Sequence, residues 1–312
     1  GSVTYYSTNE DPTLTNSSRS IIWIVTDADS DGAGAANSSG VTSTIIITPL
    51  NDVPVVTAGG SLAYTENSLA AIIDNTIAIS DPDDIELSSA SVTISSDFTT
   101  GDVLELTTQN GISGTFESST GVLTISGTAS LDNYQTALRS ITYHSTSEDP
   151  TDISISRSIT WIVTDANSDG VGAANSSGST TTINITPIND APSSVNLIEP
   201  DNNNLSLTVN NIQTDNLLLQ WSSSIDAEED NLTYLLYSEW DTTGQLPTQI
   251  YYPQNRILNI SLADTQYTLS YNVLFDALNF TNIVWVKQPV MRWKVDVTDQ
   301  TDTTFSSSFS NI

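Results

Sequence analysis

The chain has 312 residues, of which 37 are Asp or Glu and only 7 are Lys or Arg, so its formal net charge is −30. Such a surface repels nucleic-acid phosphates and anionic membranes and attracts divalent cations, so we expect no nucleic acid as a partner. No apolar run approaches the roughly 18 residues of a membrane helix, so this segment is not expected to insert into a membrane. Cys is absent, and any staple between domains must therefore be something other than a disulfide, such as a metal ion.

An internal repeat organises the first two thirds of the chain. Residues 3–54 align without a gap to residues 141–192, and 37 of these 52 positions are identical. Trp23 thereby matches Trp161, at an offset of 138 residues. A full repeat then runs from about residue 53 to residue 190, and residues 1–52 correspond to the C-terminal part of such a repeat. We expect three domains, over residues 1–52, 53–190 and 191–312.

Alternation of apolar and polar residues predicts β-strands along the whole chain. In the first copy the expected strands are residues 3–8, 19–26 and 42–48. In the complete repeat they are residues 61–65, 71–79, 90–95, 103–107, 114–117, 122–126, 141–145, 157–164 and 181–186, with one helical turn over residues 131–138. In the last domain they are residues 217–221, 232–238, 257–262, 267–272, 290–298 and 304–309. The fold class expected is all-β, in tandem Ig-like sandwiches of which the first is incomplete.

An acidic loop follows the tryptophan strand in both copies. It reads D-A-D-S-D-G in the first copy and D-A-N-S-D-G in the second. Carboxylates at every second residue of a tight loop that ends in Gly can wrap a calcium ion, which prefers six to eight oxygen ligands. Ser38 and Ser176 stand where an EF-hand has its final Glu, so the loop is not an EF-hand. The alternative is a solvated acidic hairpin tip. The candidate ligands here are Asp27, Asp29, Asp31, Asp165, Asn167 and Asp169.

Further acidic motifs lie between and beyond these loops. They are Glu66 in T-E-N, Asp81 and Asp83 in S-D-P-D-D, Asp132 after Gly121 and Leu131, and the Asn-Asp pairs Asn51-Asp52 and Asn189-Asp190. In this order they resemble the cadherin-like tandem repeats of very large bacterial surface proteins and adhesins, over about residues 1–192. Tyr134 departs from the family, which has a glutamate at that place. Residues 191–312 resemble a fibronectin type III-like module by Trp221, Tyr234, Trp293 and the ending Val297-Thr298-Asp299.

The resemblance implies Ca²⁺ at the joints between domains, with ligands from both sides of each joint. So many carboxylates crowded together would repel one another strongly without a cation. At the first joint the implied ligands are Asn51, Asp52, Asp81, Asp83 and Asp165. At the second they are Glu66, Asp132, Asn189 and Asp190, completed by Asp226, Glu228 and Asp299 of the following domain.

The expected function is a non-enzymatic, calcium-stiffened segment of an extracellular bacterial adhesin or surface stalk. Neighbouring repeats or copies of the same protein are the expected partners, and cell-surface glycans or proteins are candidate ligands. The single histidine, His144, is expected on a strand face and suggests no catalytic triad.

Two alternatives stay open. The first is a structural subunit of an extracellular filament or sheath assembled by strand complementation, because Tyr5, Trp23 and Ile45 of the incomplete first copy would leave an apolar face bare. The second is an ancillary carbohydrate-binding region of a secreted enzyme, with Tyr237, Trp240, Tyr251 and Tyr252 as a candidate sugar platform.

Overall fold

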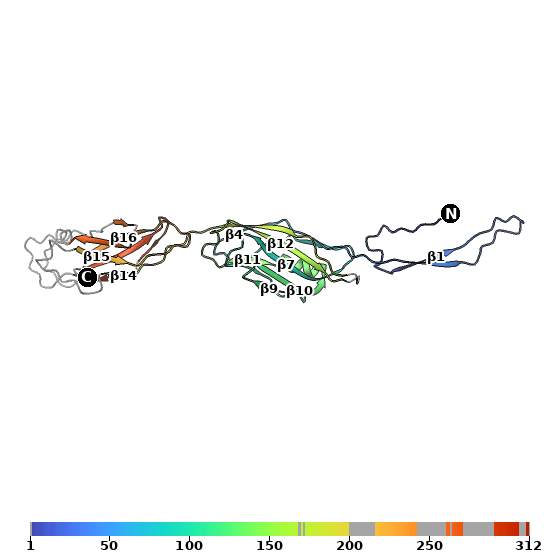
Figure 1. Ribbon diagram of the computed structural model, residues 1–312, viewed down its shortest axis with the longest axis horizontal. Coiled ribbons are helices and arrows are strands. Elements are labelled where there is room, and N and C mark those ends of the chain that lie inside the picture. Colours follow the sequence, from blue (N-terminus) through green and yellow to red (C-terminus); the bar gives the residue numbers. More distant parts are fainter. Residues whose placement is uncertain are drawn as a thin grey trace, which may run out of the picture. The chain divides into compact units, whose positions relative to one another are not determined.

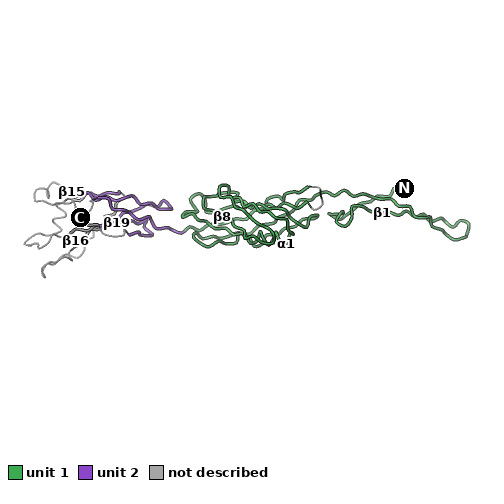
Figure 2. Tube along the Cα trace, turned by 90° about the horizontal axis from the view of Figure 1, so that it is seen from below, with its two compact units in different colours: residues 1–187 green, residues 188–312 purple. Residues whose placement is uncertain are grey.

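The computed structural model describes residues 2–167, 170, 172–199, 216–241, 260–262, 264–270, 290–305 and 310–311. The contacts divide the chain into two compact units, residues 1–187 and residues 188–312 (Figure 2), and each unit is described by itself. The architecture is all-β, as the sequence predicts, with a single α-helix among the described residues. That helix has nine residues. No helix in the described part of the chain is long and apolar enough to cross a membrane.

The elements of the first unit follow in chain order and are labelled in Figure 1 where there is room. They are β1 (Ser18–Trp23), β2 (Val41–Ile46), β3 (Val55–Thr57), β4 (Ser61–Thr65), β5 (Ala71–Ile72), β6 (Ala78–Ser80), β7 (Glu86–Ser96), β8 (Asp102–Glu105), β9 (Ser113–Glu117), β10 (Val122–Ser130), α1 (Leu131–Arg139), β11 (Thr142–Ser145), β12 (Ser156–Asp165) and β13 (Ser179–Thr186).

The complete repeat is a sandwich of two sheets. The larger sheet has the order β4-β13-β12-β7-β10-β9, the smaller has the order β5-β11-β8, and β3 pairs with β6 beside them. Strand β12 alternates buried and half-buried residues, so that Ile159, Trp161 and Val163 point into the core with no exposed surface. From the facing sheet, Tyr143 packs its ring edge-on against Tyr64, with 5.0 Å between the ring centroids.

The predicted helical turn is confirmed as α1. The side chain of Ser130 accepts a hydrogen bond from the backbone N–H of Asn133 and caps the helix. Asp132 in the first turn and Arg139 in the last turn both complement the helix dipole. Tyr134, which replaces the family's glutamate, is fully buried and serves the core.

The strand predicted over residues 71–79 is wrong, because the chain turns in its middle. Asp74 accepts hydrogen bonds from the backbone N–H groups of Gly59, Gly60 and Thr76 and from the Thr76 hydroxyl. A buried carboxylate that collects so many donors fixes a turn. The segment is therefore split into β5 and β6, which pair with different strands.

The strand predicted over residues 3–8 is also not formed. In the complete repeat the matching strand β11 is held by ladders to β5 on one side and β8 on the other. Among the described residues, the first copy offers residues 3–8 no equivalent of either neighbour. Alternation alone does not make a strand, because its N–H and C=O groups need partners.

The second unit has the strands β14 (Leu197–Glu199), β15 (Asn216–Trp221), β16 (Thr233–Asp241), β17 (Ile260–Leu262), β18 (Gln266–Ser270), β19 (Val290–Thr298), β20 (Thr303–Thr304) and β21 (Ser310–Asn311). They form one sheet with the order β14-β15-β18 and another with the order β17-β16-β19-β20. Trp221, Tyr234 and Trp293 meet at its buried core. The predicted strand residues 257–259, 271–272 and 306–309 lie outside the described residues.

Candidate metal centre

The S-D-P-D-D motif forms a tight loop between β6 and β7. One carboxylate oxygen of Asp81, Oδ1, accepts the backbone N–H groups of Asp83 at 3.2 Å and Asp84 at 3.0 Å, which fixes the loop. Each of these three aspartates thereby places one carboxylate oxygen within 4.8 Å of the others. Asp84 was not among the residues predicted from the sequence, although the doubled Asp in the motif was a signal for it.

The linker residues make two hydrogen bonds, one to the end of β12 and one to this loop. The side-chain amide of Asn51 donates to Oδ2 of Asp165 at 3.1 Å. The backbone N–H of Asp52 donates to Oδ2 of Asp83 at 2.8 Å. The first unit therefore brings together the residues that were predicted for the first joint. We call Asn51, Asp52, Asp81, Asp83 and Asp165 the first cluster.

Three oxygens of the first cluster are buried and have no hydrogen-bond donor. They are Oδ1 of Asn51, Oδ2 of Asp81 and Oδ1 of Asp83. Buried oxygens without a partner are rare in folded proteins, because desolvating them is costly. An amide oxygen and carboxylate oxygens are also the ligands that calcium prefers. The residues present therefore fit a hard divalent cation.

The charge of the first cluster also favours a bound divalent cation. Burial, together with the neighbouring carboxylate of Asp83, raises the pKa of Asp81 to about 6. An acid with a raised pKa is one whose charge the protein does not compensate. A bound divalent cation would supply the missing positive charge.

The second unit repeats this arrangement with different residues. The side-chain amide of Asn189 donates to Oδ2 of Asp299 at 2.9 Å, as Asn51 does to Asp165. The backbone N–H of Asp190 donates to Oε2 of Glu228 at 3.3 Å, as Asp52 does to Asp83. The second cluster consists of Asn189, Asp190, Asp226, Glu228 and Asp299.

Buried oxygens without a donor recur in the second cluster as well. They are Oδ2 of Asp190, Oδ2 of Asp226 and Oε1 of Glu228. Burial and the charges of Asp190 and Asp226 raise the pKa of Glu228, whereas the hydrogen bond from Asn189 lowers the pKa of Asp299. The Asn189 amide also donates to Asp302, at 3.1 Å. Asp302 was not among the residues predicted from the sequence. The Asn-Asp pairs of both clusters belong to the internal repeat, whereas the acceptors Glu228 and Asp299 come from a part of the chain that lies outside it.

The expectation that Asp132 shares a joint with Glu66 does not agree with the strand register. Glu66 follows β4, and its backbone N–H donates to the carbonyl of Thr186 at the end of β13. Asp132 follows β10, whose last residue pairs with Glu86 at the start of β7. These two ends of the sheet are separated by the length of β12, about 33 Å for ten residues. The Asp132 side chain is exposed, and the role of Glu66 as a ligand stays a prediction.

The carboxylates of the D-A-D-S-D-G loop are exposed, and they accept hydrogen bonds from the loop's own backbone. Asp27 accepts the N–H of Asp29 at 3.1 Å and that of Ala36 at 3.2 Å, and Asp29 accepts the N–H of Gly34 at 2.6 Å. Asp31 accepts the N–H of Ala33 at 3.2 Å. These bonds account for the loop's shape.

The second copy of the loop makes the same bonds with a neutral residue. Asn167 stands in place of Asp29, and its side-chain oxygen accepts the N–H of Gly172. Both residues have a positive φ, 53° for Asp29 and 57° for Asn167, which Asn and Asp adopt most readily after Gly. Asp169 lies outside the described residues. A separate calcium site in this loop stays a prediction, while Asp165 belongs to the first cluster.

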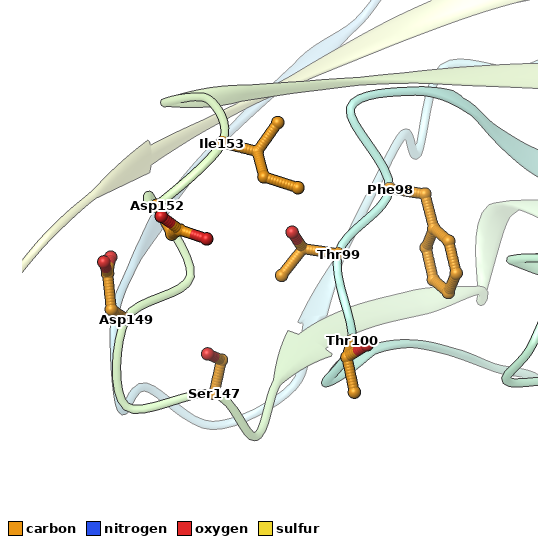
Figure 3. Close-up of a pocket in the computed structure, with 7 residues that line it drawn as sticks. All are labelled: Phe98, Thr99, Thr100, Ser147, Asp149, Asp152 and Ile153. Carbon is orange, nitrogen blue, oxygen red and sulfur yellow. The ribbon is translucent and has the colours of Figure 1, made fainter. Parts of the chain in front are cut away.

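A surface pocket of about 370 Å³ lies beside the β7–β8 loop (Figure 3). Its lining is mostly polar and acidic, whereas small-molecule sites of this size are mainly apolar. It is lined by Phe98, Thr99, Thr100, Ser147, Asp149, Asp152 and Ile153. Of the candidate sugar platform, Tyr251 and Tyr252 fall outside the described residues, as do the side chains of Tyr237 and Trp240.

Fold and site together define an all-β chain of sandwich domains with carboxylate clusters beside its Asn-Asp linkers. No protein-family model matches the chain. A curated relative is halomucin from Haloquadratum walsbyi (strain DSM 16790 / HBSQ001), which is 34% identical over 108 residues. The match covers 33% of this chain, and it spans 1% of the length of halomucin.

Similar solved structures are cadherin ectodomains. The protocadherin gamma-B4 extracellular domain is 14% identical with a TM-score of 0.31, over 95% of this chain and 39% of that one. Mouse cadherin-23 EC22–24 is 13% identical with a TM-score of 0.31, over 93% and 72% of the two chains. The human desmocollin-1 ectodomain is 12% identical with a TM-score of 0.29, over 95% and 46%. This similarity concerns the fold alone.

Proposed function

We propose that the chain is a non-enzymatic structural segment of an extracellular surface protein, stiffened by calcium beside its Asn-Asp linkers. The observation that carries the proposal is that one hydrogen-bond pattern, with buried oxygens that have no hydrogen-bond donor, occurs beside the Asn-Asp pair in both units. The net charge of −30 agrees with a protein that collects cations. The match to a minute share of halomucin supports a segment of a very long protein.

In the first cluster, the oxygens of Asn51, Asp81 and Asp83 would hold the ion, with the neighbouring carboxylates of Asp84 and Asp165 around it. A bound calcium ion supplies positive charge and cross-links oxygens from distant parts of the chain. In the second cluster the corresponding oxygens belong to Asp190, Asp226 and Glu228.

The arrangement restrains the linkers even before any ion binds. The pair Asn51-Asp52 is tied by its amide to the end of β12 and by its backbone to the loop after β6. An ion that shares the oxygens of Asn51, Asp81 and Asp83 would add a contact that resists rotation of this pair. The proposed role of calcium is therefore mechanical, in holding a joint.

Isothermal titration and thermal unfolding in calcium and in chelator test this function. Extracellular calcium modules have dissociation constants of roughly 0.1–1 mM. A hundredfold excess of ion over such a constant stabilises the folded state by about 2.7 kcal/mol per site. We expect at least two binding events and a higher unfolding temperature in calcium.

Matched variants distinguish calcium binding at the two clusters from non-specific attraction of calcium by the negative charge of the chain. Asp83→Asn and Glu228→Gln each remove one charge from one cluster, and each should weaken one binding event about tenfold or more, since affinity follows ligand charge. Asp152→Asn removes an exposed charge outside both clusters and should change neither event. Identical melting curves in calcium and in chelator, or equal effects of all three variants, would refute the proposal.

A further inference from the structure

Residues 2–50, which we call the open hairpin, contain two strands that pair as their counterparts in the complete repeat do. Strand β1 pairs with β2 in the register in which β12 pairs with β13, so that Trp23 lies opposite Val41 as Trp161 lies opposite Ser179. The indole N–H of Trp23 donates to the Ser43 hydroxyl, as that of Trp161 donates to Thr181.

The inward face of the open hairpin is nevertheless bare. Trp23 is 42% exposed and Val25 is 71% exposed, whereas their counterparts Trp161 and Val163 are completely buried. Tyr5 is 44% exposed, whereas its counterpart Tyr143 is completely buried. Large contiguous apolar surfaces of this kind mark interaction sites on soluble proteins.

The open hairpin also presents a cation for which its own residues supply no carboxylate. The Arg19 guanidinium donates to the carbonyls of Pro12, Asn16 and Ser18. Arg157 makes the same three bonds, to Pro150, Ser154 and Ser156.

The two arginines differ in one further contact, a hydrogen bond from Nε to a carboxylate. Nε of Arg157 also donates to Asp102 at 2.6 Å, and both side chains of this pair are fully buried. Among the described residues, no carboxylate lies within salt-bridge distance of Arg19. An arginine held in place beside an apolar face therefore calls for an acidic partner group.

A second carboxylate is implied by the tryptophan. In the complete repeat, the Thr181 hydroxyl accepts a hydrogen bond from Trp161 and donates one to Asp74, at 3.1 Å. The Ser43 hydroxyl accepts from Trp23 in the same way, so it can also donate a hydrogen bond to an acceptor. Counterparts of Asp102 and Asp74 would place two acidic groups at fixed positions within this apolar surface.

We propose that this face is an interface for a β-segment built like residues 53–140, with aspartates in the places of Asp102 and Asp74. Residues 53–140 cover the corresponding face of the complete repeat, which is the direct template for such a partner. A second open hairpin does not fit, because it would bring another Arg19 and has no residue that corresponds to Asp102 or Asp74. The proposal is independent of calcium.

The test is an extended chain in which a second copy of residues 53–140 is placed directly before Val3. Amide hydrogen exchange over residues 18–48 is compared with exchange in the unmodified chain and with exchange over residues 156–186 of the same molecule. In the extended chain we expect exchange over residues 18–48 to slow at least about a thousandfold, because core strands exchange only through rare unfolding of a whole domain. In the unmodified chain the same residues should exchange rapidly.

Charge variants test the specificity of the interface. Asp102→Asn placed only in the added copy, or Arg19→Met, should return much of the fast exchange in the extended chain. Arg19→Met in the unmodified chain should change nothing. Fast exchange over residues 18–48 in the extended chain overturns the proposal, and so does protection that both variants leave intact. Strong protection in the unmodified chain at a concentration where it forms dimers would identify a second hairpin as the occupant and would also overturn it.

Discussion

Asp102→Ala should be among the most destabilising substitutions in the complete repeat. The Asp102 carboxylate accepts hydrogen bonds from Nε of Arg157 at 2.6 Å, from the Tyr143 hydroxyl at 2.6 Å and from the backbone N–H of Thr99 at 2.9 Å. Its removal leaves the buried Arg157 guanidinium without a counter-charge, and breaking one side of a buried pair costs about 3–5 kcal/mol. Arg157 keeps its backbone acceptors, so we expect about 3 kcal/mol, the lower end of that range.

A double-mutant cycle measures this value. Denaturant-dependent hydrogen exchange over residues 156–165 reports the unfolding of this repeat separately from the rest of the chain. Combining Asp102→Ala with Arg157→Met removes both charges, so the double variant should be clearly more stable than the sum of the single losses predicts. Arg19→Met is the matched control, because Arg19 has no such partner, and it should cost no more than about 0.5 kcal/mol. A loss below about 1 kcal/mol for Asp102→Ala, or an additive cycle, would refute the reasoning.

Two further predictions concern carboxylates that shape loops. Burial by itself raises the pKa of Asp74, but hydrogen bonds from Thr76 and the glycine N–H groups outweigh it and hold the pKa at about 2. Because this folded-state pKa lies below the usual 3.8, the stabilisation is complete above about pH 4 and is lost as the pH falls towards 2. Asp74→Asn should flatten this part of the stability profile, measured by denaturant unfolding between pH 2 and pH 6, and an unchanged acid dependence would contradict it. Asp29→Asn should alter neither stability nor calcium titration, because Asn167 makes the same bond in the second copy; a lost binding event would show that the loop is itself a metal site.

The strands that the sequence predicts well are those in which alternation coincides with at least one neighbouring strand to pair with. Strand β12 is the clearest case, since its alternating apolar residues Ile159, Trp161 and Val163 are all buried. Residues 3–8 alternate as well but form no strand among the described residues, because pairing is a property of the neighbours. The break at Asp74 could not be read from the sequence, because it depends on the backbone of Gly59 and Gly60 arriving from elsewhere in the fold.

The candidate site was also predictable from the sequence only in part. Asn51, Asp81 and Asp165 are far apart in the sequence, and only the resemblance to known repeats suggested that they meet. Asp132 was assigned to the wrong end of the sheet for its partner Glu66, because a motif's order along the chain does not fix the direction of the strand that carries it. Asp226, Glu228 and Asp299 were predicted for the second joint, and again only the resemblance to known repeats suggested that they lie beside Asn189 and Asp190.

The parallel pairing of β4 with β13 determines how the complete repeat would bear a pulling force. In the sequence, β4 lies near the start of the repeat and β13 near its end. The two strands are joined by five register pairs, from Ser61 opposite Thr182 to Thr65 opposite Thr186. Tension applied at the two ends would drag the strands past each other along their length. All the hydrogen bonds between the two strands would then be loaded in shear at the same time. They could not break one after another. A repeat tied in this way would stretch little until the whole ladder failed.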